Sequence, residues 1–164
     1  MRGSLLLLIL AALSCGAPAA EAQAQRPRAE VTPAILTPRA TPGGTVVVAL
    51  KVRLPKDVHV QADRPRDPSL IPTTLTVDVP PGVTVEKISY PIATEFAQAG
   101  RADALLVFGP EFEIRVRLAL AASIGPGEVR VPARLRYQAC NDTMCFPPAR
   151  AEAHWLLQVA ALRP

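Results

Sequence analysis

The chain has 164 residues and a formal net charge of +4, and aromatic residues make up only 4% of it. So few aromatic side chains leave no stacking platform of the kind that holds the bases of single-stranded nucleic acid. The positive charge is spread through segments in which arginines alternate with apolar residues, as on a solvated sheet face. We therefore expect one domain, with no nucleic-acid partner and no cofactor.

The N-terminal segment is typical of an exported protein. Arg2 precedes an apolar run at residues 5–13, which is too short to cross a bilayer, since a spanning helix takes roughly 20 residues. Residues 22–24 (Ala-Gln-Ala) satisfy the A-x-A rule for signal peptidase. We expect residues 1–24 to be a signal peptide and the mature chain, of about 140 residues, to be periplasmic or secreted.

Cys15 leaves an alternative open for this segment. Residues 13–16 (Leu-Ser-Cys-Gly) resemble a lipoprotein cleavage site, at which the cysteine would carry a lipid and become the new N-terminus. Lipidation at Cys15 is the only membrane attachment that we expect. Either way, Cys15 is not a partner for the other two cysteines.

The segments after residue 25 predict strands. Residues 25–44 are rich in proline, which prevents a helix of useful length, and we expect a tether and an edge strand there. From residue 45 onward, apolar and polar residues alternate with the period of two that indicates half-buried strands. Gly and Pro turn signals separate these segments. The expected strands lie at residues 31–36, 45–54, 58–60, 75–79, 83–88, 105–108, 112–120, 129–137 and 153–159.

No window shows a convincing helical period, and the turn signals recur every ten residues or so. The pattern predicts an all-β protein, a single antiparallel β-sandwich over residues 30–160. Two segments lack a useful alternation. We interpret residues 61–72, punctuated by prolines, and residues 92–103 as long loops.

Cys140 and Cys145 lie between two expected strands and form a thiol pair at the tip of a hairpin. One interpretation is a structural disulfide, which is common in exported proteins. A ring of about six residues, however, removes only about 2 kcal/mol of unfolded-state entropy. If the alternation of residues 129–137 continues without a bulge, Cys140 falls on the polar face and both sulfurs lie near the surface. Surface sulfurs can exchange with the thiols of other proteins, which favours a labile disulfide.

Copper is the rival chemistry. Cys140, Met144 and Cys145 are soft ligands close together in the sequence, and His59 or His154 could join them around Cu(I). A methionine between two cysteines is more often a loop residue, and each histidine taken alone is more often an ordinary strand residue. A thiol–disulfide relay therefore remains the preferred interpretation, with a structural disulfide or Cu(I) handling as alternatives.

Residues 137–148 (YQACNDTMCFPP), together with residues 67–73 (DPSLIPT) and the Tyr90-Pro91 pair, resemble a known family. This family is the N-terminal periplasmic domain of the thiol:disulfide interchange protein DsbD, and the resemblance covers roughly residues 30–160. It implies an immunoglobulin-like fold. It also implies a redox-active pair in which Cys140 is the cysteine that is attacked and Cys145 is its companion.

The resemblance further implies partners and an oxidoreductase-type activity. The pair would accept electrons from a membrane thiol transporter or a thioredoxin-like protein and pass them to periplasmic disulfide proteins. The family's membrane and thioredoxin-like domains have no counterpart in this sequence, so we expect a separate donor protein. Tyr137, Asp142 and Pro147 are the neighbours that we expect to support the pair.

In the family, an acidic–Phe segment folds over the disulfide as a cap, and here Glu95 and Phe96 match it. The resemblance therefore assigns to Phe96 the shielding of the sulfurs from other thiols. The chain also departs from the family pattern. Ala97 stands where a tyrosine follows the cap phenylalanine, the cysteine spacing is narrower by one residue, and His59 and Gln61 replace tyrosines near the site.

Overall fold

The computed structural model describes residues 26–161, and within this range every regular element is a β-strand. The expected signal peptide at residues 1–24, including Cys15, lies outside the described residues. In chain order the strands are β1 (Glu30–Ile35), β2 (Thr45–Arg53), β3 (His59–Gln61), β4 (Thr74–Val77), β5 (Val83–Ser89), β6 (Thr94–Phe96), β7 (Leu105–Phe108), β8 (Glu111–Leu120), β9 (Gly127–Tyr137), β10 (Ala139–Cys140) and β11 (Ala149–Val159).

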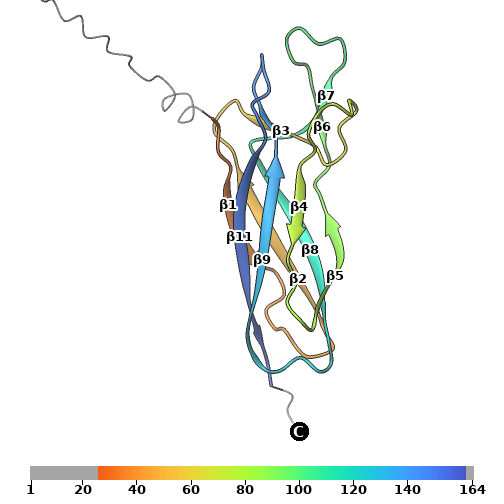
Figure 1. Cartoon of the computed structure of the whole chain (residues 1–164), viewed down its shortest axis with the longest axis vertical. Helices are drawn as coiled ribbons and strands as arrows, with labels where there is room; N and C mark the ends of the chain where they lie inside the picture. Colours follow the sequence, from red (N-terminus) through yellow and green to blue (C-terminus); the bar gives the residue numbers. More distant parts are fainter. Residues whose placement is uncertain (1–25, 162–164) are drawn as a thin grey trace, which may run out of the picture.

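These strands form three sheets, with the orders β1-β2-β8-β5, β11-β9-β4 and β10-β3-β7-β6. All pairings between the named strands are antiparallel. The two sheets of long strands make up the body of the molecule, and β3, β6 and β7 lie together at one end of it, at the top of Figure 1. The protein is therefore the immunoglobulin-like antiparallel β-sandwich that the alternation and the resemblance predicted.

The apolar core lies between the two sheets of long strands. Alternate residues of each strand point into it, as the period of two requires. Trp155 of β11 is 1% exposed, and its indole Nε1 donates a 2.8 Å hydrogen bond to the carbonyl oxygen of Ala49 in β2, which joins the two sheets. The other buried residues of these strands include Val46, Val48, Leu50, Val52, Ile114, Val116, Leu118, Val131, Leu135, Tyr137 and Leu157.

Two predicted boundaries are wrong at the end that carries the small sheet. Residues 92–103, expected to be one long loop, contain β6, which pairs with β7 at the edge of the sheet. This strand has only three residues and none of them is buried, so it leaves no alternation in the sequence. Gln61, expected to begin a loop, is the last residue of β3, whose residues are all buried and therefore show no alternation either.

Among residues 26–161 there is no helix with the length and apolar character that a membrane crossing requires.

Candidate functional site

Cys140 and Cys145 form a disulfide at the tip of the hairpin that joins β9 and β11, where the sequence predicted a thiol pair. The two sulfurs are 2.08 Å apart and the two Cα atoms are 4.0 Å apart. The loop between them is shaped by Asn141, whose Oδ1 accepts hydrogen bonds from the backbone nitrogens of Thr143 (3.1 Å) and Met144 (2.9 Å). Such side-chain-to-backbone bonds are typical of tight turns.

The predicted exposure of both sulfurs is wrong for Cys140, which is 0% exposed, whereas Cys145 is partly exposed. The alternation continues through Ala139 and breaks at Cys140, after Gln138 has separated the end of β9 from the start of β10. Here the chain leaves β11 and β4 and pairs with β3 instead. The Gln138 side chain supports this change of partner: its Oε1 accepts from the nitrogen of Ile71 (3.1 Å) and its Nε2 donates to the carbonyl of Phe146 (3.3 Å).

Gln61 of β3 lies directly beside the disulfide. Its side chain is 0% exposed, and its Nε2 donates to the sulfur of Cys140 at 3.3 Å and to that of Cys145 at 3.8 Å. Its Oε1 is buried and has no hydrogen-bond partner within the described residues. The backbone of Gln61 is held in place, since its nitrogen donates to Gln138 (3.2 Å) and its carbonyl accepts from the hydroxyl of Thr73 (2.5 Å). The resemblance placed Gln61 near the site, but the contact with the two sulfurs was not predicted.

His59 is the residue directly opposite Cys140 in the pairing of β3 with β10, so the two side chains lie on the same face. It is 6% exposed, and its Nε2 is buried without a hydrogen-bond partner in the part of the chain that the structure describes. Burial lowers the pKa of His59 below the ordinary 6.5, and the carboxylate of Asp142 opposes this shift only in part. The imidazole beside the disulfide is therefore neutral at neutral pH.

Residues 94–101, which we name the cap segment, lie against both His59 and the cysteine loop. The ring of Phe96 is 4.0 Å from that of His59, centroid to centroid, and Phe96 is partly exposed. Gln98 is 7% exposed, and its Nε2 donates to the carbonyl of Asn141 (2.9 Å) and approaches the sulfur of Cys145 (3.9 Å). The nitrogen of Ala99 donates to the carbonyl of Asp142 at 3.0 Å. The cap segment is thus hydrogen-bonded to the loop that carries the disulfide.

Two ion pairs connect the cap segment to the loop after β3. Glu95 pairs with Arg66, and Arg101 pairs with Asp67 at 2.6 Å. The nitrogen and hydroxyl of Ser69 both donate to Asp67, and these bonds, with that from Arg101, lower the pKa of Asp67 to about 2. Asp67 therefore keeps its charge, and its contact with Arg101, well below neutral pH.

The three residues expected to support the pair take different positions. Tyr137, the last residue of β9, is 1% exposed in the core, and its hydroxyl accepts a 2.8 Å bond from the nitrogen of Ala29 rather than contacting the disulfide by a hydrogen bond within the described residues. Asp142 is exposed in the cysteine loop and contacts the cap segment through its backbone. Pro147 is exposed after the loop.

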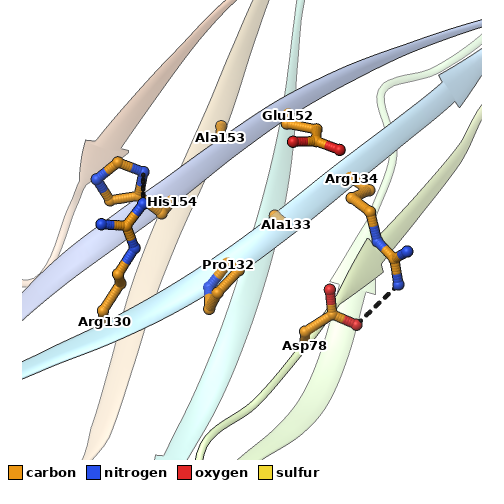
Figure 2. Close-up of a pocket in the computed structure, with 8 residues that line it drawn as sticks. All are labelled: Asp78, Arg130, Pro132, Ala133, Arg134, Glu152, Ala153 and His154. Carbon is orange, nitrogen blue, oxygen red and sulfur yellow. Dashed lines mark hydrogen bonds and ion pairs between the residues drawn. The ribbon is translucent and has the colours of Figure 1, made fainter.

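The ligands considered for copper do not all gather at the disulfide. Met144 is 54% exposed. His154 lies opposite Pro132 in the pairing of β11 with β9, and at about 3.3 Å per residue it is roughly 20 Å or more from Cys140. It lines a charged hollow on the outer face of these strands, where its Nδ1 is 3.2 Å from Arg130 (Figure 2). The described part of the chain contains no group of three or more His, Cys, Asp or Glu side chains that could hold a metal ion.

Comparison with solved structures found domains of similar kind. The DsbD N-terminal domain of Neisseria meningitidis in the reduced form is 16% identical, with a TM-score of 0.49, over 78% of this chain and 85% of that one. The N-terminal periplasmic domain of ScsB from Proteus mirabilis is 14% identical, with a TM-score of 0.49, over 79% of this chain and 46% of that one. This chain therefore spans less than half of the ScsB structure. A search of curated proteins found no match.

The sequence also matches a family described as "Thiol:disulfide interchange protein DsbD, N-terminal", over residues 27–155. The match covers all the strands of both large sheets except the end of β11, and it includes both cysteines. A disulfide at the end of the sandwich fits the thiol–disulfide exchange for which the family is named. The chain belongs to the family of DsbD N-terminal domains.

Proposed function

We propose that the chain is a periplasmic thiol–disulfide relay, which accepts electrons from a thioredoxin-like or membrane-embedded dithiol and passes them to periplasmic disulfide proteins. The observation that carries this proposal is the Cys140–Cys145 disulfide at the tip of a hairpin, in which Cys140 is buried and the residue Cys145 is partly exposed. The signal peptide expected at residues 1–24 and the periplasmic origin of the related ScsB domain support the compartment.

Burial favours Cys145 as the sulfur that a partner attacks. The resemblance alone implied Cys140, but a nucleophile cannot approach a sulfur that is 0% exposed without local opening, whereas Cys145 is accessible in part. Thiol–disulfide exchange requires direct contact between the attacking thiolate and the sulfur. We therefore assign Cys145 to the mixed disulfide and Cys140 to the leaving group.

The transfer then proceeds in two exchange steps. The partner's first thiolate attacks the sulfur of Cys145, a new S–S bond forms, and the Cys140–Cys145 bond breaks with its electron pair on Cys140. The partner's second thiol attacks its own first sulfur and releases Cys145. Two electrons and two protons pass from the partner dithiol to the cysteine pair. In the second half of the relay, Cys145 attacks the acceptor disulfide and Cys140 resolves the mixed disulfide.

The cap segment supplies the shield in this scheme. Glu95 and Phe96 restrict access to the pair, and the segment must move when a protein partner docks. Residues 94–96 of the segment are paired with β7, whereas residues 97–101 are held by two hydrogen bonds to the cysteine loop and by the ion pair of Arg101 with Asp67, whose side chains are about one-third exposed. Exposed ion pairs contribute about 0.2–1 kcal/mol each, so residues 97–101 can move at little cost while β6 stays paired with β7.

Trapping the mixed disulfide tests the function and the assignment together. The oxidised protein is mixed with a thioredoxin-like protein whose resolving cysteine is replaced by serine, quenched with acid, and mapped by mass spectrometry. We expect a partner adduct on Cys145. An adduct on Cys140 alone would reverse the assigned roles. If no adduct forms unless the protein is first unfolded, the disulfide is structural and the relay is wrong.

A further inference from the structure

The buried polar side chains of the described chain are concentrated around the disulfide. Among residues 26–161, the buried polar residues are His59, Gln61, Thr73 and Gln98. Two buried side-chain atoms in the same range, His59 Nε2 and Gln61 Oε1, have no hydrogen-bond partner. Both belong to β3, and a buried polar atom without a partner destabilises a fold and needs an explanation.

The orientation of the Gln61 amide explains why its oxygen is left unpaired. The nitrogen end points to the disulfide and lies 3.3 Å from the sulfur of Cys140 and 3.8 Å from that of Cys145. A sulfur in a disulfide is a weak acceptor, whereas a thiolate is charged, and hydrogen bonds to charged acceptors are the stronger ones. The amide is therefore placed for the reduced, charged state of Cys140 better than for the disulfide.

Few other groups can stabilise a negative charge on Cys140. His59 is neutral because burial lowers its pKa. Gln98 is the other side chain that donates to a sulfur within the described range, but it reaches Cys145 at 3.9 Å and is shared with the carbonyl of Asn141. Among residues 26–161, Gln61 alone combines complete burial with a side-chain donor directed at Cys140.

We propose that Gln61 binds the Cys140 thiolate at the moment it leaves the disulfide, and so sets the rate of electron transfer into the pair. This assignment rests on the proposed relay and on the attack at Cys145. As the new bond to Cys145 forms and the Cys140–Cys145 bond breaks, the electron pair passes to Cys140, toward which the N–H of Gln61 is already directed. Such a donor, fixed before the charge develops, needs no reorganisation during the reaction.

The free oxygen of Gln61 has a use in the next state. When the pair has taken up its protons, a cysteine S–H is a donor, and a half-turn of the Gln61 amide would bring its buried, unpartnered Oε1 to the sulfur in place of Nε2. One side chain thus offers a donor for the thiolate and an acceptor for the thiol. The unpaired oxygen of the oxidised form is the consequence of serving both reduced states.

The test compares Gln61→Met with Gln138→Met. Methionine keeps nearly the size of glutamine and removes the amide. Gln138 is the matched control, because its amide holds the same hairpin but contacts no sulfur. The rate of reduction by a thioredoxin-like dithiol is measured at pH 7. We expect Gln61→Met to slow it by about tenfold to a hundredfold, the range for a hydrogen bond to a charged group, and Gln138→Met to stay within about threefold of wild type.

A second readout separates thiolate binding from a loss of structure. In the Cys145→Ser background, Cys140 is a single thiol, and its thiolate is followed by ultraviolet absorbance as the pH rises. Adding Gln61→Met should move this transition upward by about one pH unit or more, because one unit corresponds to a tenfold change. A purely structural role would change the unfolding midpoint and leave this transition in place.

The outcomes distinguish the two proposals. If the folded wild-type protein is not reduced at all, the relay itself is wrong. If it is reduced and Gln61→Met matches it in both rate and thiolate transition, only the role of Gln61 is overturned. Equal slowing by Gln138→Met also overturns that role. Should Gln61→Met not fold, the side-chain NH₂ resonances of Gln61 in the wild type must move on reduction and again as the thiolate forms, and fixed resonances would refute the proposal.

Discussion

The body of the sandwich and the small sheet at its end bury different kinds of side chain. Between the two large sheets, the buried residues are apolar and follow the alternation of their strands, with Trp155 and Leu50 among the largest. Around the sheet β10-β3-β7-β6 lie the buried polar residues of the described chain, and two of their atoms are unpaired. The apolar packing of the two large sheets therefore stabilises the fold. The small sheet departs from apolar packing and buries polar groups beside the disulfide.

The largest effect on stability is expected from a cavity between the two large sheets. Trp155→Ala should lower the free energy of unfolding by about 3–5 kcal/mol, because it empties a buried aromatic site and removes the hydrogen bond to Ala49. Urea unfolding measures the loss. Leu156→Ala, at a neighbouring residue that is 38% exposed, is the control and should change stability far less. The folded fraction of Trp155→Ala should still be reduced at the wild-type rate, and a slower rate would mean that the two regions are coupled.

Reduction of the disulfide tests how much the end of the sandwich contributes to the stability of the protein. Reduction of the Cys140–Cys145 bond should lower the free energy of unfolding by about 2 kcal/mol, because the ring is short and constrains the unfolded chain little. Urea unfolding with and without a reductant gives the difference. A reduced protein that is unfolded in the absence of urea would show that the disulfide is a structural staple.

The buried imidazole makes the end of the molecule sensitive to acid. Because the pKa of His59 is lower in the folded state than its ordinary 6.5, the unfolded chain takes up the proton first as the pH falls. The stability that His59 contributes is present above pH 6.5 and is lost as the pH falls toward its folded-state pKa, by at most about 1.4 kcal/mol per pH unit. In His59→Gln this part of the decline should disappear from urea unfolding measured at several pH values.

His154→Gln provides the matched control for this experiment, because His154 lies on the outer face of β11 beside Arg130. The wild-type decline should remain in that variant. If His59→Gln keeps the whole decline as well, another group causes it.

The smallest expected effect concerns the cap segment. Phe96→Ala should raise the rate at which glutathione attacks the disulfide severalfold, with little change in stability, because Phe96 is partly exposed and rests on His59 outside the main core. Ile92→Ala is the control, since Ile92 is apolar and 95% exposed. An unchanged rate in Phe96→Ala would show that Phe96 does not shield the pair.

The same contrast explains what the sequence predicts well. In β2, β8 and β9 each residue's face follows from local alternation, because one side of each strand packs against the core. The cysteine pair was also evident, since cysteines between two strands mark a hairpin tip. These features depend on neighbours in the sequence and on a single buried face.

The parts that the sequence did not predict depend on distant contacts. Gln61 donates to Cys140 across 79 positions in the sequence, through a pairing of β3 with β10 that only two residues of each strand make. The burial of Cys140 follows from the change of strand partner at Gln138, and no local pattern marks that change. All residues of β3 are buried, so His59 and Gln61 do not belong to an alternating pattern. Both are polar, as loop residues usually are, and the sequence therefore does not mark them as buried.

The most direct test of the account is the rate at which a thioredoxin-like dithiol reduces the folded protein at increasing urea concentrations below the unfolding transition. The account predicts a rate that is proportional to the dithiol concentration and nearly independent of urea, because attack on Cys145 needs only movement of the cap segment. A rate that rises with urea in step with the unfolded fraction, or that levels off at the unfolding rate, would contradict it, since the disulfide would then react only after the sandwich has unfolded.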